Sequence, residues 1–103
     1  MKLLTKDLEN KLIKNGDTST QEDPTVIVKF FDPTGSWSWY GIEYDPKSRI
    51  FFGAVDGHEF ELGYFSLDEL EAVKKSPFGL GIERDIYFTS KPLSEVKKQL
   101  GKI

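Results

Sequence analysis

The chain has 103 residues, of which 30% are charged and 14% aromatic, a composition typical of one folded domain over residues 1–103 rather than of a disordered segment. Its net charge of −3 favours no general nucleic-acid binding, and the absence of cysteine excludes disulfides and thiolate metal sites. No apolar run approaches the roughly 18 residues that a membrane span needs, so we expect a cytoplasmic protein without membrane contact.

The first predicted element is a helix over residues 6–15. Thr5 precedes it as an N-cap residue, since a threonine side chain can accept from the amides of the first turn. Leu8 and Leu12 lie four residues apart and therefore share one face of the helix. Gly16 follows as a C-terminal stop, and the residues after it are polar, which predicts a loop.

Four runs rich in β-branched and aromatic residues come next, separated by turn sequences. The segments 32–35 and 45–48 place proline at the second turn position, where its fixed φ is favourable. Asp56 and Gly57 both tolerate positive φ, so they predict a tight hairpin. Together these signals predict an antiparallel meander with strands at residues 25–31, 37–44, 49–55 and 59–65.

Side-chain alternation assigns the faces of the predicted strands, because neighbouring residues in a strand point to opposite sides. The last strand is amphipathic, with its apolar residues on one face. The strand at 37–44 is largely apolar on both faces, so the sheet needs two covers. We expect helices to cover one face and a loop, a terminus or a partner to cover the other. Strict alternation places Trp37, Trp39, Gly41 and Glu43 on one face, and Ser38, Tyr40, Ile42 and Tyr44 on the other.

A second helix is predicted to begin at Ser66, since Ser66 and Glu69 have the spacing of a capping box. A loop over residues 76–82 follows, then a fifth strand over residues 85–89. Pro92 fits the first position of a last helix that ends before Gly101. The predicted fold class is α+β: an antiparallel β-meander of four to five strands with three helices.

Five motifs follow one another along the chain: WxWY, EYDP, FFGxVDG, ELGYFSLDEL and PFGLGIERDIYF. Their order resembles a small bacterial family described only as a domain of unknown function, and the similarity runs nearly end to end. Members of that family are often carried on plasmids, phages and other mobile elements, sometimes near antirestriction genes. The resemblance implies a counter-defence role of antirestriction or anti-CRISPR type, and it implies no catalytic residue.

His58, the one histidine, lies in a predicted hairpin with Asp56 and Glu59 nearby. An imidazole with two carboxylates offers nitrogen and oxygen ligands to a metal. A single histidine in a turn is a sparse ligand set, and we interpret the segment as a solvated hairpin tip. We therefore predict no metal site and no cofactor.

Glu43 and Glu61 lie in strands that the meander can bring close together. Paired carboxylates in an aromatic setting can hold different pKa values and exchange protons with a substrate. A small enzyme or ligand-binding domain that uses this pair is therefore the alternative function. The alternative lacks a nucleophile, a second histidine or a metal motif.

The preferred hypothesis is a non-enzymatic protein-binding module whose partner is another protein, with nucleic acid disfavoured as a direct ligand. Exposed aromatic residues are enriched in binding hot spots, and acidic residues can face a basic partner. Asp68, Glu69 and Glu71 with Glu59 and Glu61 can form an acidic stripe that faces a basic partner, and the alternative is an ordinary solvated helix face. The candidate binding residues are Trp37, Trp39, Glu43, Tyr44, Glu59, Glu61 and Tyr64.

Overall fold

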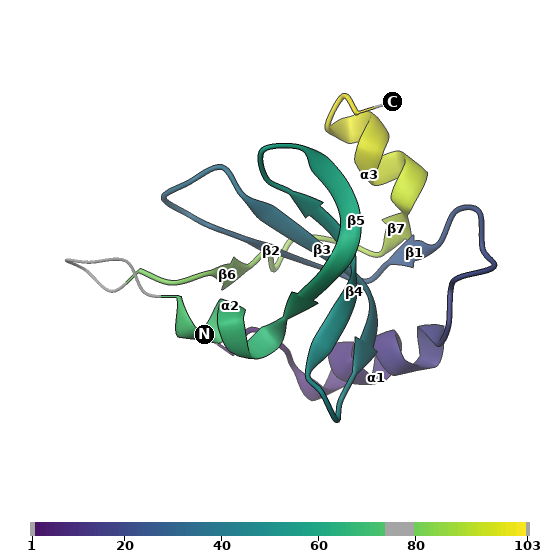
Figure 1. Cartoon of the computed structure of the whole chain (residues 1–103), viewed down its shortest axis with the longest axis horizontal. Helices are drawn as coiled ribbons and strands as arrows, with labels where there is room; N and C mark the ends of the chain where they lie inside the picture. The colour runs from purple at the N-terminus through teal and green to yellow at the C-terminus, as the bar shows by residue number, and fades with distance from the viewer. Residues whose placement is uncertain (1, 74–79, 103) are drawn as a thin grey trace.

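The protein has an α+β fold in which helices flank an antiparallel sheet, as predicted (Figure 1). The structure is a computed structural model that describes residues 2–73 and 80–102. The main sheet has the strand order β5-β4-β3-β2-β6, and β1 pairs with β7 in a second, smaller sheet. The strands are β1 (Thr25–Val26), β2 (Val28–Phe31), β3 (Ser38–Asp45), β4 (Ile50–Asp56), β5 (Phe60–Ser66), β6 (Glu83–Arg84) and β7 (Lys91–Pro92). The helices are α1 (Lys6–Asn15), α2 (Leu67–Ala72) and α3 (Leu93–Gln99).

The predicted first strand over residues 25–31 is divided between the two sheets. β1 pairs with β7, whereas β2 pairs with β3 on one side and with β6 on the other. Ile27 joins the two strands, and its amide donates to the carbonyl oxygen of Gly41 at 2.8 Å. The division depends on partners from distant parts of the chain, so the uninterrupted β-branched sequence does not reveal it.

The predicted strand over residues 85–89 is wrong. The Asp85 carboxylate accepts from the amide of Tyr87 at 2.9 Å, and an aspartate that bonds the backbone two residues onward makes a turn. The strand pairing with β2 therefore involves β6, just before this turn. Ile86 and Tyr87 are left 61% and 88% exposed.

β3 contains a β-bulge that the sequence pattern does not indicate. Gly41 pairs with Gly53, but the next paired residues are Glu43 and Phe52. Ile42 is therefore one extra residue in β3. Because side chains alternate along a strand, one extra residue exchanges the two faces for every position beyond it.

The face assignment from strict alternation is consequently wrong from Glu43 onward, whereas Ile42 shares a buried cluster with Tyr40, as assigned. Tyr44 lies opposite Phe51 and belongs to the same core cluster, against which Trp39 also packs. Glu43 lies on the other face of the sheet. On β5 the assignment is correct, because the β4–β5 pairing runs in continuous register from Phe60 to Ser66.

Local capping explains where α1 and α2 begin. The Thr5 hydroxyl accepts from the amide of Leu8 at 3.2 Å, and the Ser66 hydroxyl accepts from the amide of Glu69 at 3.2 Å. Gly16 closes α1 with a φ of 65°, in the left-handed region that favours glycine. These features confirm the predicted ends. α2 ends at Ala72, and the predicted loop over residues 76–82 lies in part outside the described residues.

α3 begins differently from the prediction. Pro92 occupies the N-cap rather than the first helical position and supplies no side-chain hydrogen bond. Asp23, on the loop before β1, caps the helix instead: its carboxylate accepts from the Ser94 amide at 2.8 Å and from the Ser94 hydroxyl at 2.6 Å. A residue distant in sequence therefore satisfies the first turn of α3.

Two clusters of buried side chains cover the two faces of the main sheet. The first is formed with residues of the N-terminal segment, α1 and α2, and the second with residues of α3 and β1. In the described part of the chain, no helix has the length and apolar character to cross a membrane. The first cluster includes Leu4, Leu12, Phe30, Tyr44, Phe51, Phe65, Leu67 and Leu70; the second consists of Val26, Tyr40, Ile42, Ala54, Leu93 and Val96.

Gly53→Ala should lower the free energy of unfolding by about 3 kcal/mol or more, because a Cβ there would lie 1.8 Å from the carbonyl oxygen of Tyr40. Gly63→Ala is the matched control, since a Cβ at that position meets nothing within 4 Å. We expect this control to change stability by less than about 1 kcal/mol. Chemical denaturation of both variants measures the difference, and equal effects would contradict the register of β3 on β4.

Asp23→Ala should lower stability at neutral pH and have less effect in acid. The Ser94 hydroxyl, and then its amide, lower the pKa of Asp23 below the ordinary 3.8. Because the pKa of Asp23 is lower in the folded state, the unfolded chain binds the proton more tightly. The stabilisation from ionised Asp23 is therefore complete above pH 3.8 and is lost as the pH falls through the lowered pKa. Urea midpoints at pH 7 and near pH 3 measure this, with Glu22→Ala as the exposed control. A pH-independent difference between wild type and Asp23→Ala would contradict the capping role.

Candidate functional site

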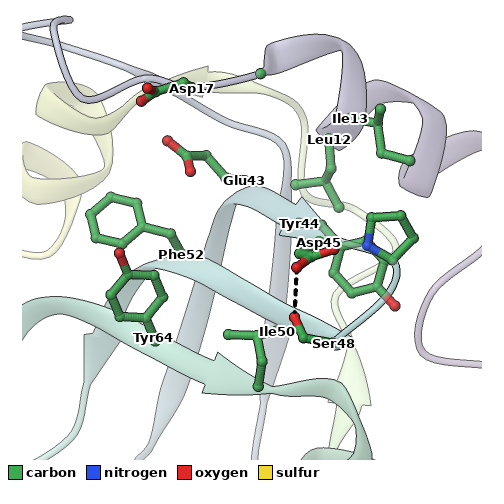
Figure 2. Close-up of a pocket in the computed structure, with 12 residues that line it drawn as sticks. Leu12, Ile13, Asp17, Glu43, Tyr44, Asp45, Ser48, Ile50, Phe52 and Tyr64 are labelled. Atoms are coloured by element: carbon green, nitrogen blue, oxygen red, sulfur yellow. Dashed lines mark hydrogen bonds between the residues drawn. The ribbon is translucent and has the colours of Figure 1, made fainter.

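A cleft of about 340 Å³ opens between the end of α1 and strands β3, β4 and β5 (Figure 2). Ile13 comes from α1, and Asp17 from the loop that follows it. Glu43 comes from β3, Phe52 from β4 and Tyr64 from β5. Five separate segments of the chain therefore contribute to one concave surface.

The bulge in β3 explains why the cleft lies here. Beyond Gly41, β2 no longer pairs with β3, and the open edge of β3 faces α1. The Asn15 side-chain amide bridges this gap by donating to the carbonyl oxygens of Ile42 at 2.8 Å and Thr25 at 3.0 Å. α1 is thereby held beside the edge of β3, with Leu12 in the core and Ile13 45% exposed.

One side of the cleft is aromatic. Phe52 and Tyr64 are directly paired across β4 and β5, and their ring centroids are 5.3 Å apart. Tyr64 is 75% exposed and Leu62, on the same face of β5, is 58% exposed. The second core cluster covers this sheet face around Tyr40 and Ala54 but does not include these residues. We call Phe52, Leu62 and Tyr64 the open face.

The Glu43 carboxylate is fixed at the edge of the cleft by Thr18. One of its oxygens accepts from the Thr18 amide at 2.7 Å and from the Thr18 hydroxyl at 2.6 Å. Thr18 itself is buried, so these bonds fasten the loop after α1 onto the sheet. Figure 2 shows the Glu43 carboxylate directed toward the backbone around Asp17.

Two further carboxylates line the cleft. Asp17 accepts from the amide of Ser19 at 2.9 Å, and this bond lowers the pKa of the Asp17 carboxyl. The two oxygens of Asp45 accept from the Lys47 amide and the Ser48 hydroxyl, at 2.9 Å each, which lowers the pKa of Asp45 as well. Both aspartates are therefore ionised at neutral pH and held in fixed orientations.

A second, smaller hollow of about 270 Å³ lies at the β4–β5 hairpin. Trp37, His58, Glu59 and Glu61 line it. The indole of Trp37 packs so closely on Gly57 that a Cβ there would lie 2.6 Å from the ring, and His58 meets the same indole edge-on at 5.4 Å. Trp37 packs on the hairpin with part of its indole and remains 38% exposed.

The structure divides the predicted binding residues between these two hollows. Glu43, Tyr44 and Tyr64 lie at the cleft, whereas Trp37, Glu59 and Glu61 lie at the hairpin. Tyr44 is 7% exposed, and burial raises the pKa of its hydroxyl, so it contributes to the core as well as to the cleft wall. Trp39 lies at neither hollow and packs against the first core cluster.

The expected pairing of Glu43 with Glu61 is wrong in its geometry. Glu61 lies opposite Val55, and Glu43 lies opposite Phe52, three residues earlier in β4. An odd separation along a strand puts the two carboxylates on opposite faces of the sheet. They line separate hollows and cannot act on one substrate.

The predicted acidic stripe is not a free anionic surface along α2. Arg49 bonds Asp68 at 2.6 Å and Glu71 at 2.7 Å, so its guanidinium offsets both carboxylates. The left-handed φ of 60° at Arg49 ends the β3–β4 turn. Nor does either of the chain's arginines pair with Glu43 or Glu61, since Arg84 donates to the carbonyl oxygens of Lys2 and Leu3.

The cleft residues that sequence reasoning did not select include Ile13, Asp17, Phe52 and also Asp45, which was assigned only to a turn. Ile13 follows the buried Leu12 in an amphipathic helix, and this position was only a weak signal that Ile13 is exposed. Asp17 gave no signal, because a loop aspartate is ordinarily solvated. Phe52 was hidden by its apolar neighbours, since the bulge decides which of them faces the cleft.

Among residues 2–73 and 80–102, no three or more histidine, aspartate or glutamate side chains are grouped so that they could hold a metal ion. The carboxylates at the cleft instead accept hydrogen bonds from nearby backbone and hydroxyl groups. The arrangement can therefore present fixed negative charge beside aromatic rings.

A family model described as "Protein of unknown function (DUF2958)" matches residues 3–100. The match covers nearly the whole chain and agrees with the family resemblance found in the motifs. No curated protein and no solved structure matches the chain. The description carries no activity, so functional inference rests on the cleft and the open face.

Glu43→Ala should destabilise the protein by about 1–3 kcal/mol, because it leaves the buried amide and hydroxyl of Thr18 without their acceptor. Faster hydrogen exchange of the Thr18 amide should accompany this loss. The matched control is Glu61→Ala, which removes an exposed carboxylate on the opposite face. Denaturation and exchange measure both variants, and equal behaviour would show that Glu43 does not fasten the loop.

Proposed function

The chain belongs to the DUF2958 family, and we propose that it is a non-enzymatic protein-binding module. The observation that carries the proposal is the open face, on which Leu62 and Tyr64 are 58% and 75% exposed. Ile13 continues this apolar surface across the cleft and is 45% exposed. Contiguous exposed apolar side chains of this kind are typical of protein interaction sites.

Chemical features of the open face support binding rather than a purely structural role. Tyrosine offers a large contact area with few rotatable bonds, so fixing it against a partner costs little conformational entropy. β5 is also the edge strand of the main sheet. Its outer backbone groups lie beside Leu62 and Tyr64, where an extended segment of a partner can add to the sheet.

An enzyme that uses Glu43 with Glu61 is not favoured, because the two carboxylates lie on opposite faces. The remaining carboxylates at the cleft are held by hydrogen bonds from Thr18, Ser19, Lys47 and Ser48. Carboxylates held in this way provide a fixed electrostatic field. Acid–base catalysis instead needs a group positioned to exchange its proton with a substrate.

A counter-defence role is part of this proposal. It rests on the mobile-element setting that the family resemblance implies, and it would make the partner a host defence protein met in the cytoplasm. Expressing the protein in cells with active restriction or CRISPR interference, and counting surviving phage or plasmid, tests that role separately. If restriction and CRISPR interference are unchanged in all systems tested, the counter-defence role is rejected and the binding proposal is unaffected.

The double variant Leu62→Ser/Tyr64→Ala should lose binding to its partner and keep its fold. A hot-spot loss of about 2 kcal/mol weakens affinity roughly thirtyfold. The matched control is Ile86→Ser/Tyr87→Ala, which removes an equally exposed aliphatic–aromatic pair elsewhere on the surface.

Affinity capture from the source cell, with wild type and both variants as bait, measures this effect. The captured protein should appear with wild type and with the control variant but not with Leu62→Ser/Tyr64→Ala. Thermal unfolding confirms that each variant is folded. Capture by all three proteins alike would refute the open face as the binding surface.

A further inference from the structure

We propose that the cleft between α1 and strands β3–β5 binds an arginine side chain of the protein partner. This inference deepens the proposed function and rests on it. It names the chemistry of the group that enters the cleft, which the open face alone does not determine. The argument depends on charge, on the aromatic wall and on the arginines of the chain itself.

The charged side chains that line the cleft are all acidic, and Lys47 in the turn beside Asp45 is the one cation that acts on the pKa of that carboxyl. Asp17, Glu43 and Asp45 line the cleft, and no lysine or arginine is among its described lining residues. None of these three carboxylates takes part in an ion pair found between described residues. A concave surface with one sign of charge and apolar walls concentrates its field on an entering cation.

The carboxylates are positioned before any ligand arrives. Thr18 fixes one oxygen of Glu43, and the Ser19 amide fixes one oxygen of Asp17. A preorganised acceptor loses little conformational entropy when it binds, so more of the interaction energy is retained as affinity. A guanidinium can then bond the remaining acceptor positions with its several N–H groups.

The aromatic wall selects arginine from the possible cations. Phe52 and Tyr64 line the same cleft as the carboxylates, with ring centroids 5.3 Å apart and ring planes tilted by 59°. A planar guanidinium stacks on such rings and bonds a carboxylate with its edge, whereas an ammonium is a more strongly hydrated point charge. Ile13 on the facing wall can pack against the methylene groups of the arginine side chain.

A second copy of this chain is a poor source of the arginine. The sequence has two arginines, and both are already bonded within the fold. Arg49 bonds Asp68 and Glu71, and Arg84 donates to backbone carbonyl oxygens of the N-terminal segment. The occupant therefore comes from a different protein.

N-acetyl-arginine-methylamide is the probe, titrated into isotopically labelled protein while backbone amide shifts are recorded by NMR. We expect saturable shifts confined to the cleft, with a dissociation constant on the order of millimolar, as a single side chain supplies. The citrulline analogue has the same shape without the charge and should bind at least about tenfold more weakly, which corresponds to about 1.4 kcal/mol.

Tyr64→Ala and Asp17→Asn should each weaken the arginine probe about fivefold or more, since one removes a ring face and the other a charge. Their matched controls are Tyr87→Ala and Glu22→Gln, which make the same chemical changes at exposed positions outside the cleft. All four positions are on the surface, so folding should be retained and is checked by the same spectra.

The proposal is overturned if the arginine probe causes no saturable shifts, if citrulline binds equally well, or if Tyr64→Ala and Asp17→Asn bind like their controls. These results are separate from the test of the binding module. Loss of partner capture by Leu62→Ser/Tyr64→Ala without arginine binding would keep the module and reject the arginine. Arginine binding at the cleft with capture unaffected would keep the cleft chemistry and reject the open face.

Discussion

The extra residue in β3 is the constraint on which the rest of the structure depends. At Ile42 the strand gains one residue against β4, and its two faces exchange beyond that point. β2 departs from β3 at the same place, which leaves an edge of backbone groups to be satisfied. The Ile27 amide bonds Gly41, and the Asn15 side chain bonds Ile42, so β1 and α1 are both attached there. The bulge thereby determines where β2, β1 and α1 lie relative to β3.

The cleft is a consequence of the same bulge. It turns Glu43 away from the core, where a carboxylate would be costly, and directs it to the loop after α1. It also turns Tyr44 inward, where the ring packs on Phe51 at 4.7 Å. α3 packs on the sheet face that carries the second core cluster and leaves Tyr64, on the same face, exposed. Fixed charge beside uncovered aromatic rings supports the proposal of recognition over catalysis.

Elements that depend on near neighbours in the sequence were predictable. The first turn of α1 needs only Thr5 and an amide three residues away, and Ser66 acts in the same way for α2. Apolar periodicity located the strands of the meander, because each alternates or repeats within a few residues. The α+β class follows from that order of helices and strands. Tyr64 was a candidate binding residue because it is aromatic.

By itself, the sequence determined the local conformations: the capped helices, the hairpin turns and the apolar runs, whose energetics involve residues a few positions apart. Tertiary structure decided the bulge at Ile42, the capping of α3 by Asp23 and the separation of Glu43 from Glu61. Each of these is a contact or a register between segments distant in the chain. Periodicity cannot report a one-residue change of register, because the same residues satisfy the pattern on either face.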